Sequence, residues 1–152
     1  MLEFNVLGYP EVYLDDELVE NFLSNKVIVL LCYLALNPHV HARERLAGLF
    51  WGDMPDSNAK SNLRQALHDL NKRVGDYVEV TRQTVRFQAD KPHHIDVLAL
   101  KNTREDENAS IDSLEAVSTR YRGMFLQGIN LDVEGDLEEW LRAEQEHCRL
   151  NY

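Results

Sequence analysis

Residues 56–75, DSNAKSNLRQALHDLNKRVG, have the pattern of one long amphipathic helix. Asp56 is a good N-cap residue, since its carboxylate can accept the free backbone N–H groups of the first helical turn. Gly75 is the expected end of the helix, because glycine adopts a left-handed conformation without steric cost. Apolar residues recur between them at helical spacing and predict a single buried stripe, made of Ala59, Leu63, Ala66, Leu67, Leu70 and Val74.

The opposite face of this helix is polar and cationic, with Asp69 as its only acid. At about 1.5 Å per residue the helix is roughly 27 Å long, and a helix of this kind suits the major groove of DNA. The same pattern also fits an ordinary solvated face on a core helix, so the flanking segments have to distinguish the two. The residues of this face are Lys60, Ser61, Arg64, Gln65, His68, Lys72 and Arg73.

Two shorter helices are predicted before the cationic one. The run from Asn25 to Leu36 follows Ser24, a suitable N-cap residue, and is apolar almost all round, which indicates a buried helix. The second helix spans Ala42 to Phe50 or Trp51. This succession of helices is that of a helix-turn-helix whose last helix reads DNA. In the second helix we expect Leu46, Leu49 and Phe50 to face inward, and Arg43, Glu44 and Arg45 to face outward.

The segment after Gly75 predicts a β-hairpin over residues 77–87. Apolar and polar residues alternate in VEV at 78–80 and in VRF at 85–87, on either side of the polar tip TRQT at 81–84. A hairpin that directly follows a recognition helix is a wing, and an exposed arginine at its tip, here Arg82, can contact phosphate or enter the adjacent minor groove. A purely structural hairpin with an incidental surface arginine is the alternative.

The N-terminal residues predict a small antiparallel sheet. Leu2–Leu7 and Val12–Leu14 are short apolar segments on either side of Gly8-Tyr9-Pro10, where glycine and proline separate two strands. Leu18-Val19 is expected as a third short strand.

The C-terminal part of the chain predicts a linker and further helices. Residues 90–94 are expected to connect the hairpin to a short helical piece near Leu98 and Leu100, and the polar stretch 102–110 is the best linker. This places one domain at 1–101 and a second region at 102–152. Since the chain stops within a helical pattern, the second region is expected to be the truncated start of a longer one. Its expected helices are Ile111–Tyr121 and a last helix from Leu137 onward, capped by Asp136, with Trp140 and Leu141 on one face.

The net charge of -10 by itself argues against simple nucleic-acid binding. The distribution of the charge matters more than its sum. Residues 57–86 hold six Lys or Arg and three Asp or Glu, so the basic charge collects on the cationic helix and the hairpin. A footprint of this size on an acidic protein predicts weak non-specific affinity for DNA.

Other function classes leave no signal in the sequence. The chain contains no P-loop, nucleophile elbow or dinucleotide fingerprint. His39, His41 and the pair His93-His94 lack further ligands at a zinc spacing, and the two cysteines share no motif. Neither a signal peptide nor an apolar run long enough for a bilayer is visible. We therefore expect a cytoplasmic protein without cofactor, metal, membrane association or catalysis.

Several separated blocks of the chain resemble one known family in the right order. RERLAGLFWGDMPDSNAKSNLRQALHDLNKRVGDYVEVTRQTVRF, at 43–87, resembles the OmpR-type winged helix-turn-helix of the Streptomyces antibiotic regulatory protein family. EFNVLGYPEVYLDDELV, at 3–19, resembles the leading sheet of that domain. YRGMFLQG at 121–128 and LEEWLRAEQE at 137–146 resemble the start of its bacterial transcriptional activation domain, an all-helical, tetratricopeptide-like region.

This resemblance implies an α+β fold with an N-terminal antiparallel sheet and a C-terminal wing, followed by the first helices of an all-α region. It implies a sequence-specific transcription regulator, an activator, with the recognition helix at 57–74 in the major groove of double-stranded DNA and the wing at 77–87 beside it. It also implies direct-repeat DNA sites, contact with RNA polymerase and a longer parent protein. The candidate DNA-binding residues are Lys60, Ser61, Asn62, Arg64, Gln65, His68, Lys72, Arg82 and Arg86.

A protein-interaction module of the same fold, with weak or lost DNA binding, is the alternative function. An acidic surface would be no handicap for such a module. The two functions predict different surfaces around the cationic helix. A continuous positive face favours DNA, and a face interrupted by Asp69, Asp76 and Glu79 favours a protein partner.

Overall fold

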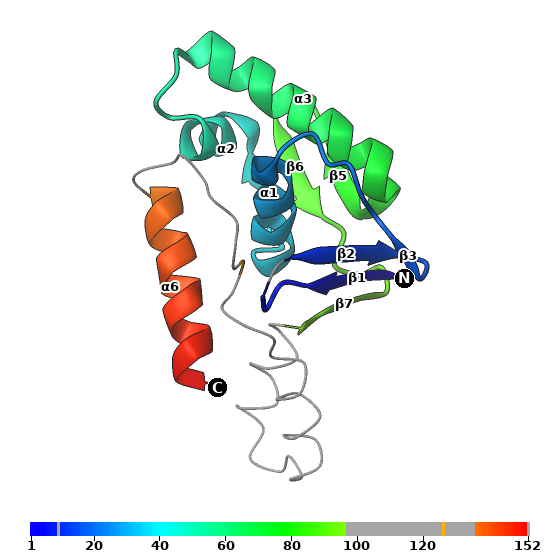
Figure 1. Cartoon of the computed structure of the whole chain (residues 1–152). Helices are drawn as coiled ribbons and strands as arrows, with labels where there is room; N and C mark the ends of the chain where they lie inside the picture. The colour runs from blue at the N-terminus through cyan, green and yellow to red at the C-terminus, as the bar shows by residue number, and fades with distance from the viewer. Residues whose placement is uncertain (9, 97–125, 127–135, 152) are drawn as a thin grey trace, which may run out of the picture.

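The computed structural model describes residues 1–8, 10–96, 126 and 136–151, which form an α+β structure with four α-helices and two β-sheets (Figure 1). None of the described helices is both long and apolar enough to cross a membrane. The strands are β1 (Leu2–Asn5), β2 (Glu11–Leu14), β3 (Glu17–Leu18), β4 (His41–Ala42), β5 (Val78–Val80), β6 (Thr84–Phe87) and β7 (His93–Ile95). The helices are α1 (Asn25–Leu36), α2 (Arg43–Phe50), α3 (Asp56–Val74) and α6 (Asp136–Asn151), with a 3₁₀ turn η1 (Gly75–Tyr77) after α3.

The first sheet differs from its prediction by one strand. The strand order is β3-β2-β1-β7, and the three predicted strands pair antiparallel, but β7 pairs parallel to β1. The prediction of a connector over 90–94 and of a purely antiparallel sheet was therefore wrong. The short segment His93–Ile95 has no alternation of its own and becomes a strand only because β1 offers it a free edge. Beyond this strand, the buried carboxylate of Asp96 accepts the backbone N–H groups of Val6 and Leu7 at 3.0–3.1 Å.

The second sheet contains the predicted hairpin. Strands β5 and β6 are antiparallel, with Val78 opposite Phe87 and Val80 opposite Val85. A third strand, β4, was not predicted and pairs with β6 through His41 opposite Val85. The hairpin is therefore anchored to the start of α2, which follows β4 directly.

The helix α1 is largely buried, as its apolar sequence predicts, and α3 buries the stripe that its periodicity predicts. α1 has the predicted bounds and lies between α3 and the first sheet (Figure 1). The whole predicted stripe of α3, from Ala59 to Val74, is buried, and Gly75 ends the helix with a φ of 62°. The predicted cap was wrong: Pro55 occupies the N-cap position, and Asp56 is the first helical residue, with no side-chain cap hydrogen bond.

The core continues across the two sheets through aromatic side chains. The Phe4 and Phe87 rings, one from each sheet, lie 6.2 Å apart between their centroids. The Tyr77 hydroxyl accepts the backbone N–H of Leu2 at 3.2 Å and donates to the carbonyl of Pro92 at 2.5 Å. One side chain from the base of the hairpin thus ties the second sheet to the edge of the first.

The last helix, α6, packs on the same core. Leu137 is fully buried, and the Trp140 ring meets the Tyr33 ring of α1 edge-on, with 5.0 Å between their centroids. The helix begins at Asp136, close to its predicted start. The predicted helical piece near residues 98–100, the linker at 102–110 and the helix at 111–121 lie outside the described residues, as does the predicted domain boundary.

Candidate nucleic-acid interface

The outer face of α3 is cationic and free of exposed acids after its first residue. Lys60, Arg64, His68 and Lys72 are all exposed and follow each other at intervals of four residues, which places successive side chains along one side of the helix. Gln65 is also exposed. The molecule therefore presents a ridge of hydrogen-bond donors about 18 Å long, at 1.5 Å per residue from residue 60 to residue 72.

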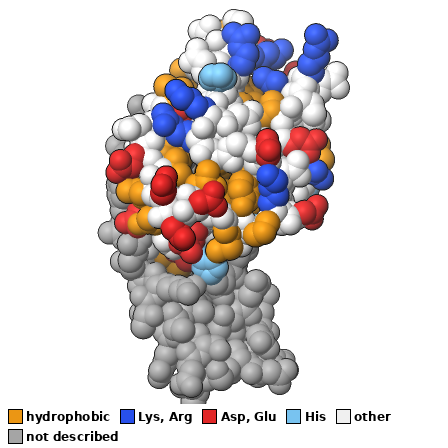
Figure 2. Space-filling model, turned by 90° about the vertical axis from the view of Figure 1, so that its right-hand side faces the viewer, with side chains coloured by type: hydrophobic (Ala, Val, Ile, Leu, Met, Phe, Trp, Pro, Cys, Tyr) orange, Lys and Arg blue, Asp and Glu red, His pale blue; other side chains and the backbone are white. Residues whose placement is uncertain are grey.

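Most of the Lys and Arg side chains on one face of the molecule lie toward one end of it, and the others lie among the acids (Figure 2). Figure 2 shows Lys and Arg side chains toward the upper end of the face it draws, at the height that α3 occupies in Figure 1. Most of the Asp and Glu side chains on that face lie below them, at and above the height of the first sheet. The acidic character of the chain is thus compatible with a local positive surface.

The three acids of segment 57–86 are each paired with a cation. Asp69 was predicted on the outer face, and this was wrong: only 8% of it is exposed. Its carboxylate accepts the backbone N–H of Leu23 at 2.9 Å and pairs with Arg73 at 3.3 Å. The other two ion pairs are Glu79 with Arg86 at 2.9 Å and Asp76 with Lys91 at 3.9 Å.

These pairs leave the remaining four cations of the segment without an acidic partner. Lys60, Arg64, Lys72 and Arg82 form no ion pair or hydrogen bond with any residue that the structure describes. Three of them lie on the outer face of α3, and Arg82 is exposed at the tip of the hairpin. The outer face of α3 therefore lacks Asp69, whereas Asp76 and Glu79 remain exposed after the helix.

Three of the predicted site residues have less accessible side chains. Ser61 and Asn62 are half-buried at the margin of the α3 face, and the Asn62 amide donates to the Met54 sulfur at 3.1 Å in the loop before the helix. Arg86 is also half-buried, on strand β6 of the hairpin. Its guanidinium donates to Glu79 at 2.9 Å and to Gln88 at 3.0 Å, so its charge is compensated within the hairpin.

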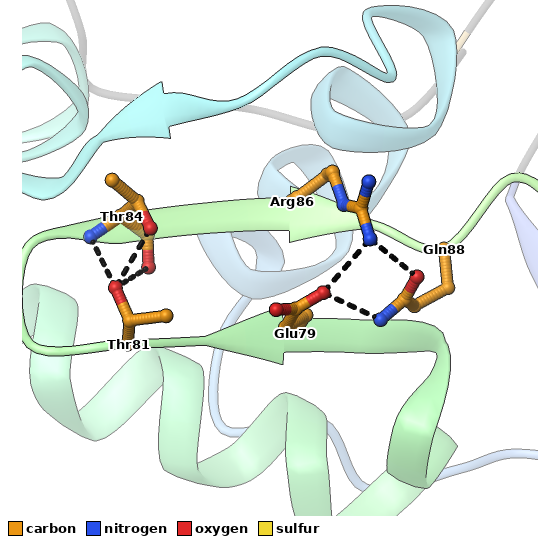
Figure 3. Close-up of polar contacts among 5 residues, drawn as sticks. All are labelled: Glu79, Thr81, Thr84, Arg86 and Gln88. Carbon is orange, nitrogen blue, oxygen red and sulfur yellow. Dashed lines mark hydrogen bonds and ion pairs between the residues drawn. The ribbon is translucent and has the colours of Figure 1, made fainter.

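The hairpin is held by two clusters of side-chain hydrogen bonds (Figure 3). At its base, Glu79, Arg86 and Gln88 form a closed triangle, which the Gln88 amide completes by donating to Glu79 at 2.7 Å. At its tip, the Thr81 hydroxyl oxygen accepts the backbone N–H of Thr84 at 2.9 Å and lies 2.7 Å from the Thr84 hydroxyl. Such side-chain caps order a short turn, because they bond backbone groups that would otherwise bind only water.

Sequence reasoning missed the role of Arg43. This residue was predicted to face outward from α2, but it is half-buried, and its guanidinium donates to the Thr81 carbonyl at 2.9 Å. Its backbone N–H donates to the Gln83 carbonyl at 2.8 Å. No local signal could have revealed these contacts, because they join residues about forty positions apart and depend on the unpredicted strand β4.

Burial shifts the pKa values of two titratable side chains, His41 and Cys32. Burial lowers the pKa of His41, although its ring nitrogen Nε2 lies 2.7 Å from the carbonyl of Asn37. Burial raises the pKa of the Cys32 thiol far above its ordinary value, which makes it a poor nucleophile. Within the described parts of the chain, no three His, Cys, Asp or Glu side chains come together as metal ligands would.

Comparison with known proteins leaves the fold and the surface as the basis for assigning a function. No model of a known protein family matches the chain. A search of curated proteins found no significant match either.

Proposed function

We propose that this chain is a winged helix-turn-helix module that binds double-stranded DNA and regulates transcription. In this proposal α3 is the recognition helix in the major groove, α2 is the helix before it, and the β5–β6 hairpin is the wing. The observation that carries the proposal is the set of cations left without acidic partners, Lys60, Arg64, Lys72 and Arg82, on one helix face and one hairpin tip.

The chemistry of these side chains matches the two kinds of contact that DNA offers. Arg64, near the middle of the exposed face, is the best candidate for a base edge, because arginine is the commonest reader of guanine. Lys60 and Lys72 lie at the two ends of the cationic ridge, where lysines suit the phosphates on either side of a groove. Arg82 would reach the backbone or the minor groove beside it.

The small number of available cations limits the electrostatic part of binding. Three phosphate contacts, from Lys60, Lys72 and Arg82, correspond to a slope of roughly -3 in log affinity against log salt. Non-specific binding should therefore be weak, and useful affinity would depend on base contacts and on more than one bound copy. This agrees with the direct-repeat sites that the family resemblance implies.

The test is selection from a random pool of double-stranded DNA at two salt concentrations. Enrichment of a repeated motif, with affinity that falls as salt rises, would support the proposal. On the selected site, Arg64→Ala should weaken binding by about 1–3 kcal/mol if its contact is a base. The matched control is Arg142→Ala on α6, which removes a cation that pairs with Glu138 at 2.5 Å.

Two results would count against the proposal. Folded wild-type protein that enriches no sequence and shows no salt-dependent binding would favour the protein-interaction module instead. Equal affinity of the Arg64→Ala and Arg142→Ala variants would remove Arg64 from the set of recognition residues.

The wider setting of this module is also part of the proposal and rests on the family resemblance alone. The chain would act as an activator in the cytoplasm, contact RNA polymerase and continue into a tetratricopeptide-like activation region. The proposal includes no catalytic activity and no cofactor.

A further inference from the structure

Arg43 holds the two backbone carbonyls that flank Arg82. Its guanidinium donates to the carbonyl of Thr81, and its backbone N–H donates to the carbonyl of Gln83. The two distances are 2.9 and 2.8 Å, so both bonds have good geometry. One residue of α2 therefore fixes the peptide segment on both sides of the arginine at the hairpin tip.

The two hydrogen bonds of Arg43 connect the tip of the hairpin with α3. Strand β4, immediately before Arg43, pairs with β6, so the bonds made by Arg43 extend that ladder to the end of the hairpin. α2 packs directly against α3. The tip itself is ordered by Thr81, whose hydroxyl oxygen accepts the N–H of Thr84 (Figure 3) and also that of Gln83. The hairpin follows α3 directly through η1, and α2 provides a second connection that fixes Arg82 at its tip relative to the cationic face.

We propose that Arg43 is a positioning residue that sets Arg82 against the DNA backbone beside the groove occupied by α3. The inference rests on the proposed function and names a residue on which the position of the hairpin tip depends. Arg43 itself is half-buried and already donates to the hairpin. Arg82 is exposed and has no partner among the described residues, so it is the side chain available to DNA.

The chain offers a matched control for the charge of Arg43. Arg45 lies on the same helix, is exposed and forms no hydrogen bond or ion pair within the described residues. Methionine keeps an unbranched apolar stem on a helix and removes the charge and the donors. Arg43→Met and Arg45→Met therefore remove the same charge, but only Arg43→Met removes the guanidinium bond to the hairpin.

The first measurement uses the free protein and needs no DNA. Amide hydrogen exchange reports whether the tip opens locally. Arg43→Met should speed exchange at the Gln83 and Thr84 amides about tenfold, the scale of one lost charge-assisted bond. Arg45→Met should leave both rates as in the wild type. Thermal melts of the two variants verify that each is folded.

The second measurement is a double-mutant cycle for binding to the selected DNA. Arg82→Ala should lower affinity about tenfold, as for one lost charge-assisted contact. Arg43→Met should lower it by a similar factor, and the double variant should lose little more than either single variant, because both act through the same contact. The effect of Arg45→Met, whatever its size, should add to that of Arg82→Ala.

Three outcomes would overturn the inference. Additive effects of Arg43→Met and Arg82→Ala would make Arg43 an independent contact or a residue needed only for folding. Unchanged exchange of the Gln83 and Thr84 amides in Arg43→Met would show that the guanidinium bond to Thr81 does not order the hairpin tip. Absence of DNA binding by the wild type would overturn the proposed function and the role of Arg43 with it. The exchange experiment would still report separately whether the hydrogen bonds of Arg43 order the hairpin tip.

Discussion

The buried side chain of Asp69 offers the sharpest test of how α3 is oriented. Its position is unexpected, because the sequence places this acid among the cations of the outer face. In the structure its carboxylate accepts the N–H of Leu23 and pairs with Arg73. Asp69→Ala removes both interactions, whereas Asp69→Asn keeps one oxygen that can accept the N–H of Leu23 and replaces the other oxygen, together with the charge, by an amide NH2 group.

The expected magnitudes follow from these two contacts. A hydrogen bond to a charged group contributes about 1.5–3 kcal/mol, and an exposed ion pair contributes at most about 1 kcal/mol. The side chains of Asp69 and Arg73 are 11% and 24% exposed, so their pairing is worth somewhat more than that of a surface pair. We expect Asp69→Ala to lower the free energy of unfolding by about 2–4 kcal/mol, and Asp69→Asn by about 1–2 kcal/mol.

Thermal and urea unfolding of the two variants and the wild type measure directly whether their stabilities follow this order. Each kcal/mol should lower the melting temperature by about 2–4 °C for a protein of this size. DNA affinity provides a second measurement at low temperature, where all three proteins are folded. If Asp69 lay on the outer face, its removal would leave stability unchanged and strengthen DNA binding. That combination of results would refute the orientation of α3 described above.

Three further predictions concern the core and its response to pH. Leu67→Ala should lower the free energy of unfolding by about 2–5 kcal/mol in urea denaturation, because it opens a cavity under α3, and wild-type stability would show that the buried face is wrong. Tyr77→Phe should cost about 1–3 kcal/mol in the same assay, since the N–H of Leu2 and the carbonyl of Pro92 both lose their partner; an unchanged midpoint would mean that water replaces the hydroxyl. Burial lowers the pKa of His41 below its ordinary value of 6.5, so the unfolded chain binds more protons between the two pKa values, and stability should fall as the pH drops below 6.5. His41→Gln should remove this part of the slope below pH 6.5, and an identical slope in the variant would contradict the assignment.

The outer face of the candidate site was largely predictable from the sequence. Lys60, Arg64 and Lys72 are exposed as their helical spacing predicts, and Arg82 is at the predicted hairpin tip. The charge balance of the face was not predictable. It depends on contacts between distant parts of the chain, such as the ion pair of Asp76 with Lys91 and the burial of Asp69 against the backbone N–H of Leu23.

The sequence by itself determined the elements whose signal lies within a few residues. The bounds of α1, the buried stripe of α3, its end at Gly75 and the β5–β6 hairpin all follow from periodicity or turn chemistry, which depend on neighbours along the chain.

Only the tertiary structure decided the features that need a distant partner. The strands β4 and β7 are too short to carry a pattern, and they form because β6 and β1 supply the backbone hydrogen bonds. In the same way, Asp69 is buried because the N–H of Leu23 needs an acceptor, and Arg43 faces the hairpin because two carbonyls there need a donor. Buried polar groups are almost always hydrogen-bonded. Partners that are far apart in the sequence come together only in the folded chain, so the sequence alone does not identify them.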